Sequence, residues 1–484
     1  MNSSALKAKL EAKDPSVLEV LLNVNAQAKD VAEEARQRLI NAITVYEKTF
    51  ASEEVVVVRA PGRVNLIGEH TDYNGFPVMP MAISRDMLIV AGASKDNVIS
   101  FANVVSSFQG GSFTIERNIP PYQGGDWGNY IKSATQGLID FWGTEDGLQG
   151  LKMVIDGNVP LASGLSSSAA FTVAAAEAIL AINGRTIDPV VLAEVMAKSD
   201  HYVGMASGGM DQSISILGQA GKCLKIDFYP IRTKLVTLPK EADILVCHSR
   251  VKAAKAGNAR IAYNMRTVEC RIAYMLLHKL AGKAGAKEPT MLYDWFANET
   301  DGFDDALNKI ESALVDEGYT VKMIADALGV SEEYAAKEVC LTKTGEVMPE
   351  PQGGFQVKKR ARHVISEARR VEDSMALLNG DSENKAEAFG LLMDQSHASC
   401  RDDYEISCEE LNALVEAGKA AGSYGSRLTG AGFGGCTVHL IPKGKGPEFI
   451  KKIHEAYYLP HDLDGYADNQ YLFAPAQGAG VLFK

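Results

Sequence analysis

Apolar residues near the start of the chain recur at the spacing of an α-helix. Residues 5–49 are rich in Ala, Glu, Lys and Leu, contain no Gly, and include one proline, Pro15. Within this stretch, apolar residues fall three or four positions apart at Val31, Ala35, Leu39, Ala42 and Val45. Such spacing places an apolar stripe along one side of a helix. The pattern predicts helical structure over 5–49 with one buried face.

The pattern changes to that of strands after residue 50. The β-branched run Val55–Val58 predicts a buried strand. Further strands are predicted at 87–93, 98–105, 151–155, 223–228, 242–247, 436–441 and 479–482. Helices are predicted at 129–141, 166–182, 188–202, 252–283, 356–379, 384–396 and 408–421, and residues 285–355 carry several short helical patterns.

This mixture of strands and helices predicts an α+β protein with two lobes. The length of 484 residues is consistent with two or three domains. We place the boundary near residue 235, with an N-terminal lobe over 1–235 and a C-terminal lobe over 236–484. The C-terminal lobe would contain a helical insertion at about 285–355.

Charge and cysteine usage narrow the class of protein. The formal charge of −12 argues against a nucleic-acid binder or a protein that binds anionic membranes, but leaves room for a local phosphate site. The seven cysteines include no CxxC pair, which is typical of free thiols in a reducing compartment. The first residues show no apolar core of signal-peptide type, and no apolar run approaches the length of a membrane span. We therefore expect a cytoplasmic protein.

The segment from Arg59 to Asn74 carries the densest cluster of candidate chemistry. It places Arg63, Asn65, Glu69, His70 and Asp72 within ten residues, among the structure-breaking residues Pro61, Gly62 and Gly68. Carboxylates and amides this close together suit a polyhydroxylated ligand, because each can hydrogen-bond neighbouring hydroxyls. The pattern predicts a shaped binding loop, and a charged surface loop is the alternative.

A second segment suits a phosphate group. Residues 163–170 contain Gly164 and four serines, and they lead into a predicted apolar helix. Free N–H groups and the helix dipole favour anions at such a helix start. The P-loop pattern GxxxxGK[ST] is absent, and a plain helix cap packed with small residues is the alternative.

Two further glycine-rich segments complete the set of motifs. Asp211 lies in a stretch of small residues, Gly204 to Ser213, where the backbone can approach a ligand closely. Gly430, Gly432, Gly434 and Gly435 fall within six residues just before a predicted strand. Four glycines there suit close approach of a nucleotide or of another loop.

Together these segments resemble the motifs of the galactokinases, a branch of the GHMP small-molecule kinases. The segment 59–74 is similar to the galactokinase sugar signature, while 160–170 and 428–436 resemble motifs of the wider superfamily in the same order. The resemblance covers residues 35–484 and implies the two-lobed GHMP kinase fold, with mixed sheets, flanking helices and an active site between the lobes. The implied activity is phosphorylation of a sugar by ATP with Mg²⁺.

The resemblance also implies roles for single residues. Asp211 would act as the catalytic base toward the anomeric hydroxyl, with Arg63 beside it. Glu69, His70, Asp72 and the backbone of Gly208 would bind the sugar, and Asn65 would serve the junction of phosphate and sugar or brace the loop. The residues implied to bind the nucleotide are Gly164, Ser166, Ser167, Ser168, Gly432 and, near adenine, Trp127. For Mg²⁺ the implied ligands are Ser168 and an acid, either at Asp200 or, in another match, at the position of Ser199.

Several substrates and one different class of protein stay open at this point. D-Galactose is the leading substrate, N-acetylgalactosamine is the close alternative, and L-arabinose shares the axial 4-hydroxyl. A non-catalytic sugar sensor with the same fold would be expected to lose the phosphate loop or Asp211, and both are intact here. We expect a monomer.

Overall fold

The computed structural model describes the chain except for residues 52, 205–207, 252–257, 282–287, 343–344 and 464–468. Three helices begin the chain: α1 (Ser3–Glu11), α2 (Pro15–Val24) and α3 (Lys29–Phe50). The helical structure predicted over 5–49 is thus observed as three helices, because the chain turns before Pro15 and again before α3. Asp14 caps α2 by accepting a hydrogen bond from the N–H of Ser16 at 2.9 Å, and Pro15 takes the first helical position.

The half of the molecule that contains α1–α3 is built around a six-stranded sheet. Its strand order is β12-β1-β2-β5-β3-β4. The strands are β1 (Val55–Ile67), β2 (Met79–Ala93), β3 (Val98–Asn103), β4 (Gly111–Thr114), β5 (Leu151–Gly157) and β12 (Gly480–Phe483). Neighbours run antiparallel, except that β3 and β5 are parallel.

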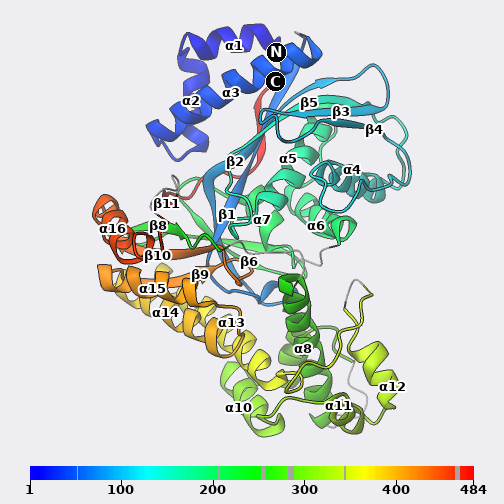
Figure 1. Ribbon diagram of the computed structural model, residues 1–484, viewed down its shortest axis with the longest axis vertical. Coiled ribbons are helices and arrows are strands. Elements are labelled where there is room, and N and C mark those ends of the chain that lie inside the picture. The colour runs from blue at the N-terminus through cyan, green and yellow to red at the C-terminus, as the bar shows by residue number, and fades with distance from the viewer. Residues whose placement is uncertain (52, 205–207, 252–257, 282–287, 343–344, 464–468) are drawn as a thin grey trace.

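The two faces of this sheet are covered by different helices, as the period of two along its strands requires. Val55 and Val57 face the N-terminal helices, whereas Val56 and Val58 face the core beneath α5. The helices on the second face are α4 (Asn129–Trp142), α5 (Ser167–Ile182), α6 (Pro189–Ser199) and α7 (Met210–Leu217). Figure 1 shows the sheet between these two layers.

The second half holds a four-stranded antiparallel sheet and most of the remaining helices. The sheet order is β11-β8-β10-β9, from β8 (Ala242–His248), β9 (Gly425–Thr429), β10 (Cys436–Pro442) and β11 (Gln470–Phe473). A separate hairpin joins β6 (Cys223–Asp227) and β7 (Arg232–Val236). The helices are α8 (Asn258–Ala281), α9 (Leu292–Glu299), α10 (Phe303–Ala313), α11 (Val321–Leu328), α12 (Glu332–Tyr334), α13 (Val357–Asn379), α14 (Lys385–Asp402), α15 (Glu409–Ala421) and α16 (Gly446–Ile453). In Figure 1, α8 and α10–α12 form the end of the molecule farthest from α1.

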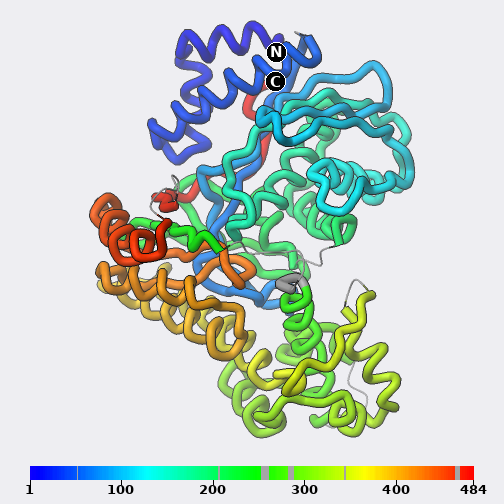
Figure 2. Tube along the Cα trace, viewed as in Figure 1, coloured from blue at the N-terminus to red at the C-terminus, as the bar shows by residue number. Residues whose placement is uncertain are grey.

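Both chain ends meet at the first sheet. In Figure 2 the red C-terminal segment returns to lie beside the blue N-terminal part, and β12 pairs with β1. The last strand of the predicted C-terminal lobe is therefore part of the N-terminal sheet. Apart from this strand, the boundary near residue 235 stays a prediction.

Most predicted elements have a counterpart in the structure, and the sugar-signature loop is the main correction. β1 extends to Ile67, so Arg63 and Asn65 lie on a strand and not in a loop. Irregularities in the pairing with β2, between Pro61 and Arg63 and between Asn65 and Ile67, let the strand carry these breakers. The predicted helix over 252–283 is observed as α8 from Asn258, and residues 252–257 lie outside the described residues.

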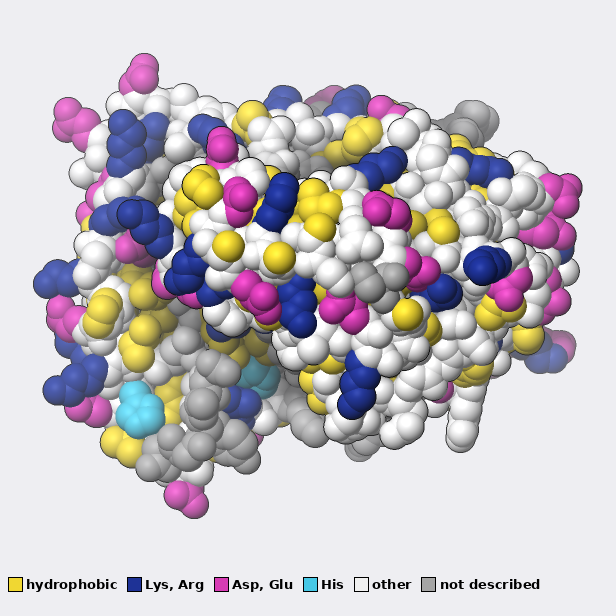
Figure 3. Space-filling model, turned by 90° about the horizontal axis from the view of Figure 1, so that it is seen from above, with side chains coloured by type: hydrophobic (Ala, Val, Ile, Leu, Met, Phe, Trp, Pro, Cys, Tyr) yellow, Lys and Arg dark blue, Asp and Glu magenta, His cyan; other side chains and the backbone are white. Residues whose placement is uncertain are grey.

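Over the face seen in Figure 3, side chains of both signs are interspersed. None of the described helices combines the length and apolar composition that a membrane crossing needs. All seven cysteines are free thiols.

Candidate active site

The predicted phosphate loop, residues 163–170, is held between the two other motifs. From β1, the N–H of Arg63 donates to the carbonyl of Leu165 at 3.0 Å. From the other side, a Cβ atom on Gly430 would lie 2.6 Å from the carbonyl oxygen of Gly164, which leaves no room for a side chain. Glycine is therefore required where the third motif packs against the phosphate loop.

Asp211 and Arg63 form an ion pair next to this loop. Asp211 lies in the first turn of α7, where the helix dipole favours a carboxylate, and its Oδ1 is 2.7 Å from Nε of Arg63. The Ser166 hydroxyl donates to the other carboxylate oxygen, Oδ2, and a second Arg63 nitrogen donates to the carbonyl of Gly164. The predicted catalytic pair is thus assembled, with one end of it on the phosphate loop.

Asp72 lies near Asp211, because it contacts Met210, the residue before Asp211 in α7. It begins a short 3₁₀ turn, Asp72–Asn74, and its Oδ2 accepts the N–H of Met210 at 3.4 Å. A Cβ atom on Gly208 would lie 2.3 Å from the Asp72 carboxylate carbon, so the Gly208 backbone packs directly on this side chain. Burial, and then the charge of Asp211, raise the pKa of Asp72 to about 6. Two carboxylates at one site, in different surroundings, suit different tasks.

Glu69 is buried and paired with an arginine that the sequence analysis missed. Its Oε2 lies 2.8 Å from Nη2 of Arg427, on β9, which also donates to the Asn65 carbonyl at 3.1 Å. Burial raises the pKa of Glu69, and the charges of Arg427 and Arg63 oppose that shift. Arg427 lies just before the third motif. A cation next to these glycines was the sequence signal that could have identified Arg427 as a site residue.

His70 is neutral and enclosed by tyrosines. Its Nδ1 lies 2.9 Å from the hydroxyl of Tyr73, and its Nε2 lies 3.2 Å from the carbonyl of Ala431 in the third motif. Its ring also contacts the rings of Tyr263 and Tyr404, neither of which the sequence analysis named. Burial, with the nearby His363, lowers the pKa of His70 to about 3. His70 therefore offers hydrogen bonds and no charge.

The start of α5 is the part of the candidate site that suits an anion. Ser166 precedes the helix with φ of +59°, and Ser167 and Ser168 lie half-buried in its first turn. In the described residues, no side chain caps this helix end. Its first N–H groups can therefore serve a phosphate.

The predicted nucleotide residues outside the phosphate loop lie in two different settings. Trp127 stacks on Phe171 of α5, with ring centroids 5.7 Å apart, and its indole N–H donates to the Gln109 carbonyl at 2.9 Å. Gly432 packs on Ile406, whose carbonyl oxygen would lie 2.3 Å from a Cβ atom there. A contact of either residue with nucleotide stays a prediction.

The two candidate acid positions for a metal differ clearly. The Ser199 hydroxyl donates to the carbonyl of Met196 at 2.8 Å and is buried. Asp200 follows α6, is partly exposed, and accepts a hydrogen bond from Nε2 of Gln212 at 2.7 Å. Because Gln212 follows Asp211 in α7, this bond ties Asp200 to the catalytic helix. A carboxylate at Asp200 and a hydroxyl at Ser168 are hard oxygen donors of the kind that Mg²⁺ takes.

Comparison with known proteins defines the class first. The family model for the GHMP kinases N terminal domain matches residues 129–219, and the model for the GHMP kinases C terminal matches 376–459. The mevalonate kinase of Methanococcus jannaschii shares this fold with a TM-score of 0.53 and 17% identity, over 88% of this chain and 99% of that one. The fold and the phosphate loop are therefore those of a GHMP kinase.

The family within that class follows from closer relatives. The galactokinase galactose-binding signature matches residues 44–93. Galactokinase of Dictyostelium discoideum is 31% identical over 97% of this chain and 98% of its own length, and human galactokinase is 34% identical over 92% and 96%. The structure of Lactococcus lactis galactokinase complexed with galactose is similar with a TM-score of 0.71 and 25% identity, over 90% and 97% of the two chains. This chain belongs to the galactokinase family.

Proposed function

We propose that this protein transfers the γ-phosphoryl group of ATP to the anomeric hydroxyl of D-galactose, giving galactose 1-phosphate and ADP. The observation that carries the proposal is the Arg63–Asp211 ion pair of 2.7 Å, set between the start of α5 and the buried Asp72. In this proposal, a phosphate donor site and a hydroxyl-binding site would meet at one carboxylate. This arrangement suits phosphoryl transfer, in which positioning and electrostatics supply most of the catalysis.

In the proposed reaction, Asp211 accepts the proton of the 1-hydroxyl as the new O–P bond forms. The bond between the γ-phosphorus and the bridging oxygen breaks, and ADP leaves with the electron pair. Arg63 pairs with Asp211 and lies where it can offset negative charge on the transferred group. Ser166 orients the second oxygen of Asp211.

The sugar would be selected by the buried carboxylates. Asp72 would accept the 3- and 4-hydroxyls and Glu69 the 6-hydroxyl, while Gly208 lets the backbone approach the ring. A buried acceptor left without its hydroxyl costs binding energy, which is the physical basis of discrimination. His70, neutral, would contact the sugar, and Asn65 would serve the junction of phosphate and sugar or brace the loop.

Nucleotide and metal would bind at the start of α5. Gly164, Ser166, Ser167 and Gly432 would contact the phosphates and Trp127 would flank adenine. Asp200 and Ser168 fit Mg²⁺ by their donor chemistry, and the metal, when bound, would neutralise charge on the phosphate oxygens. Among the described residues no three His, Cys, Asp or Glu side chains gather around a common point. Mg²⁺ in such sites typically takes one or two protein ligands and completes its shell with phosphates and water.

Location and assembly complete the proposal. Free thiols at all seven cysteines support a reducing compartment, and we propose the cytoplasm. We propose a monomer with small-molecule substrates and neither nucleic acid nor membrane as a partner.

A coupled assay of ADP release tests the proposal on galactose, N-acetylgalactosamine, L-arabinose and glucose, with Asp211→Ala as the control. We expect kcat/KM for galactose to exceed that for N-acetylgalactosamine by about tenfold or more. The reverse order would keep the chemistry and make N-acetylgalactosamine the substrate. Galactose binding without turnover of any sugar would refute the enzyme and favour a sugar sensor.

A further inference from the structure

A buried carboxylate from α13 lies beneath the turn that carries the sugar-binding residues. Oε1 of Glu367 accepts the backbone N–H of Gly68 at 2.8 Å and that of Glu69 at 3.2 Å. Gly68 has φ of +94° and His70 has φ of +60°. These left-handed conformations orient the backbone N–H groups of the turn. Two successive N–H groups on one oxygen form an anion-binding concavity of the backbone. Here the anion is the protein's own side chain, contributed from 298 residues further along the chain.

Glu367 is held in this position by further donors. The Ser396 hydroxyl donates to the same Oε1 at 2.6 Å, and Nε of Arg370 donates to Oε2 at 2.7 Å. Burial by itself would raise the pKa of Glu367, but the charges of Arg370 and Arg427 bring it well below its usual range. The side chain is therefore an ionised acceptor at neutral pH, which makes its hydrogen bonds strong.

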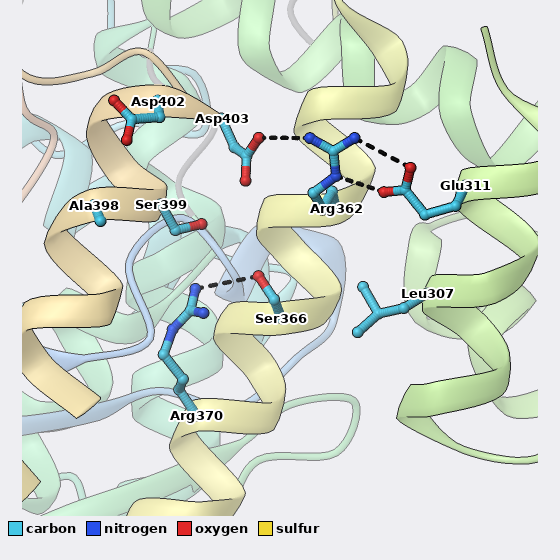
Figure 4. Close-up of a pocket in the computed structure, with 9 residues that line it drawn as sticks. All are labelled: Leu307, Glu311, Arg362, Ser366, Arg370, Ala398, Ser399, Asp402 and Asp403. Atoms are coloured by element: carbon cyan, nitrogen blue, oxygen red, sulfur yellow. Dashed lines mark hydrogen bonds and ion pairs between the residues drawn. The ribbon is translucent and has the colours of Figure 1, made fainter. Parts of the chain in front are cut away.

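Arg370, the partner of Glu367, also lines a pocket. Arg370, Ser366 and Ser399 line a cavity of about 420 Å³. Figure 4 shows these residues beside α10, α13 and α14. The Ser399 hydroxyl lies 2.8 Å from Nδ1 of His363, whose Nε2 lies 3.0 Å from the Glu69 carbonyl oxygen. The turn is thus held at its N–H groups by Glu367 and at a carbonyl by His363. The pocket gives the Arg370 side chain room to move if its carboxylate partner is neutralised.

We propose that Glu367 is a positioning residue of the sugar site, which fixes the turn at 68–70 and so places Glu69, His70 and Asp72. The inference rests on the proposed function of that site. The nucleotide site gains its shape from α5 and the third motif, and no described hydrogen bond of Glu367 reaches either. Loss of the Glu367 charge should therefore affect the sugar and spare the nucleotide.

The test is Glu367→Gln. Glutamine keeps the shape but carries no charge, and its amide must point N–H groups either at Arg370 or at the two backbone donors. We expect the Kd for galactose, measured by calorimetry without ATP, to rise about tenfold, because small displacements of positioning groups are costly. The KM for ATP should stay within about twofold of its starting value.

The chain offers a matched control in Glu269, another buried carboxylate. It accepts the N–H of Gln356 at 2.7 Å and Nε of Arg360 at 2.7 Å, so Glu269→Gln removes the same kind of charge. We expect a comparable fall in Tm with an unchanged Kd for galactose. Equal effects of both variants on the Kd, or a KM for ATP that rises as much as the Kd for galactose, would reduce Glu367 to a purely structural role.

A milder pair covers the case in which Glu367→Gln does not fold. Ser396→Ala removes one donor to Glu367, and Ser374→Ala removes a buried hydroxyl that donates to the Arg370 carbonyl at 2.6 Å. We expect only Ser396→Ala to raise the Kd for galactose, by about threefold, and an unchanged Kd would overturn the inference. If the unmodified protein bound galactose without phosphorylating it, the proposed function would fail, while the comparison of Kd values would still decide the role of Glu367.

Discussion

The candidate site has a sugar half, around Glu69, His70 and Asp72, and a phosphate half, at the start of α5. The two halves differ in the groups that form them. In the sugar half, buried side chains from distant segments hold one another, as Arg427 holds Glu69 and Gly208 packs on Asp72. In the phosphate half, Gly430 and Gly435 of the third motif pack on the carbonyl oxygens of Gly164 and Ser163 just before α5, and Ser167 and Ser168 are half-buried. Recognition of a sugar requires a specific hydrogen bond to each hydroxyl, whereas a polyphosphate requires only several hydrogen-bond donors close together. The following changes separate the two halves.

The largest effect is expected where the halves join. Asp211→Ala removes the proposed proton acceptor and leaves Arg63 without its carboxylate partner. General-base catalysis typically contributes about 10²–10⁴-fold, so we expect kcat to fall by about 10³-fold. Galactose should still bind with a Kd within a few fold, as measured by calorimetry. A fall in kcat below about tenfold would mean that positioning, and not proton transfer, makes up most of the catalysis.

Two glycines allow each half to be disturbed alone. Gly208→Ala would place a Cβ atom 2.3 Å from the Asp72 carboxylate carbon, and Gly430→Ala would place one 2.6 Å from the Gly164 carbonyl oxygen. We expect the first to lower kcat/KM for galactose and the second to raise the KM for ATP, each by about 30-fold, since overpacking in rigid surroundings costs roughly 1–3 kcal/mol. Steady-state kinetics with either substrate varied checks this. Equal effects on both substrates would mean that the halves are not separable.

Asp72 makes the sugar half sensitive to pH. Its pKa is raised to about 6 by burial and by Asp211, with Arg63 opposing, so below this pH the side chain is protonated and accepts hydroxyls poorly. We expect kcat/KM for galactose to fall about tenfold per pH unit below about pH 6, because this parameter reports the free enzyme. The KM for ATP at saturating galactose should not follow that slope. Asp72→Asn should have a lower kcat/KM for galactose that no longer falls below about pH 6. A fall that persists in this variant would show that another group titrates.

The same contrast explains what the sequence could and could not predict. The bounds of α5 were predicted within one residue, since an apolar helix that follows glycine and serines is a local signal. Arg427 and Glu367 were missed because their roles depend on contacts across 358 and 299 residues. His363 and Glu367 do stand one helical turn apart among Val364, Ala368 and Val371, and polar residues on a buried face were the available hint. The wrong loop assignment at Arg63 shows that Pro and Gly can be tolerated in a strand with irregular pairing.

The smallest expected effect concerns Trp127, at the edge of the phosphate half. Its ring stacks on Phe171 at 22° and also packs edge-on against Phe101, so it is in part a core residue. If its ring also flanks adenine, Trp127→Leu should raise the KM for ATP by about threefold, since aromatic contacts contribute about 0.5–1.5 kcal/mol, and leave the KM for galactose unchanged.

Trp142, at the far end of α4, supplies the matched control for this change. Its ring lies under Arg185 at 4.4 Å, away from the phosphate loop, so Trp142→Leu should lower Tm without raising the KM for ATP. A fall in Tm for Trp127→Leu with an unchanged KM for ATP would make Trp127 a packing residue only. The nucleotide would then be recognised chiefly through its phosphates, and the contrast between a specific sugar half and a general phosphate half would become sharper.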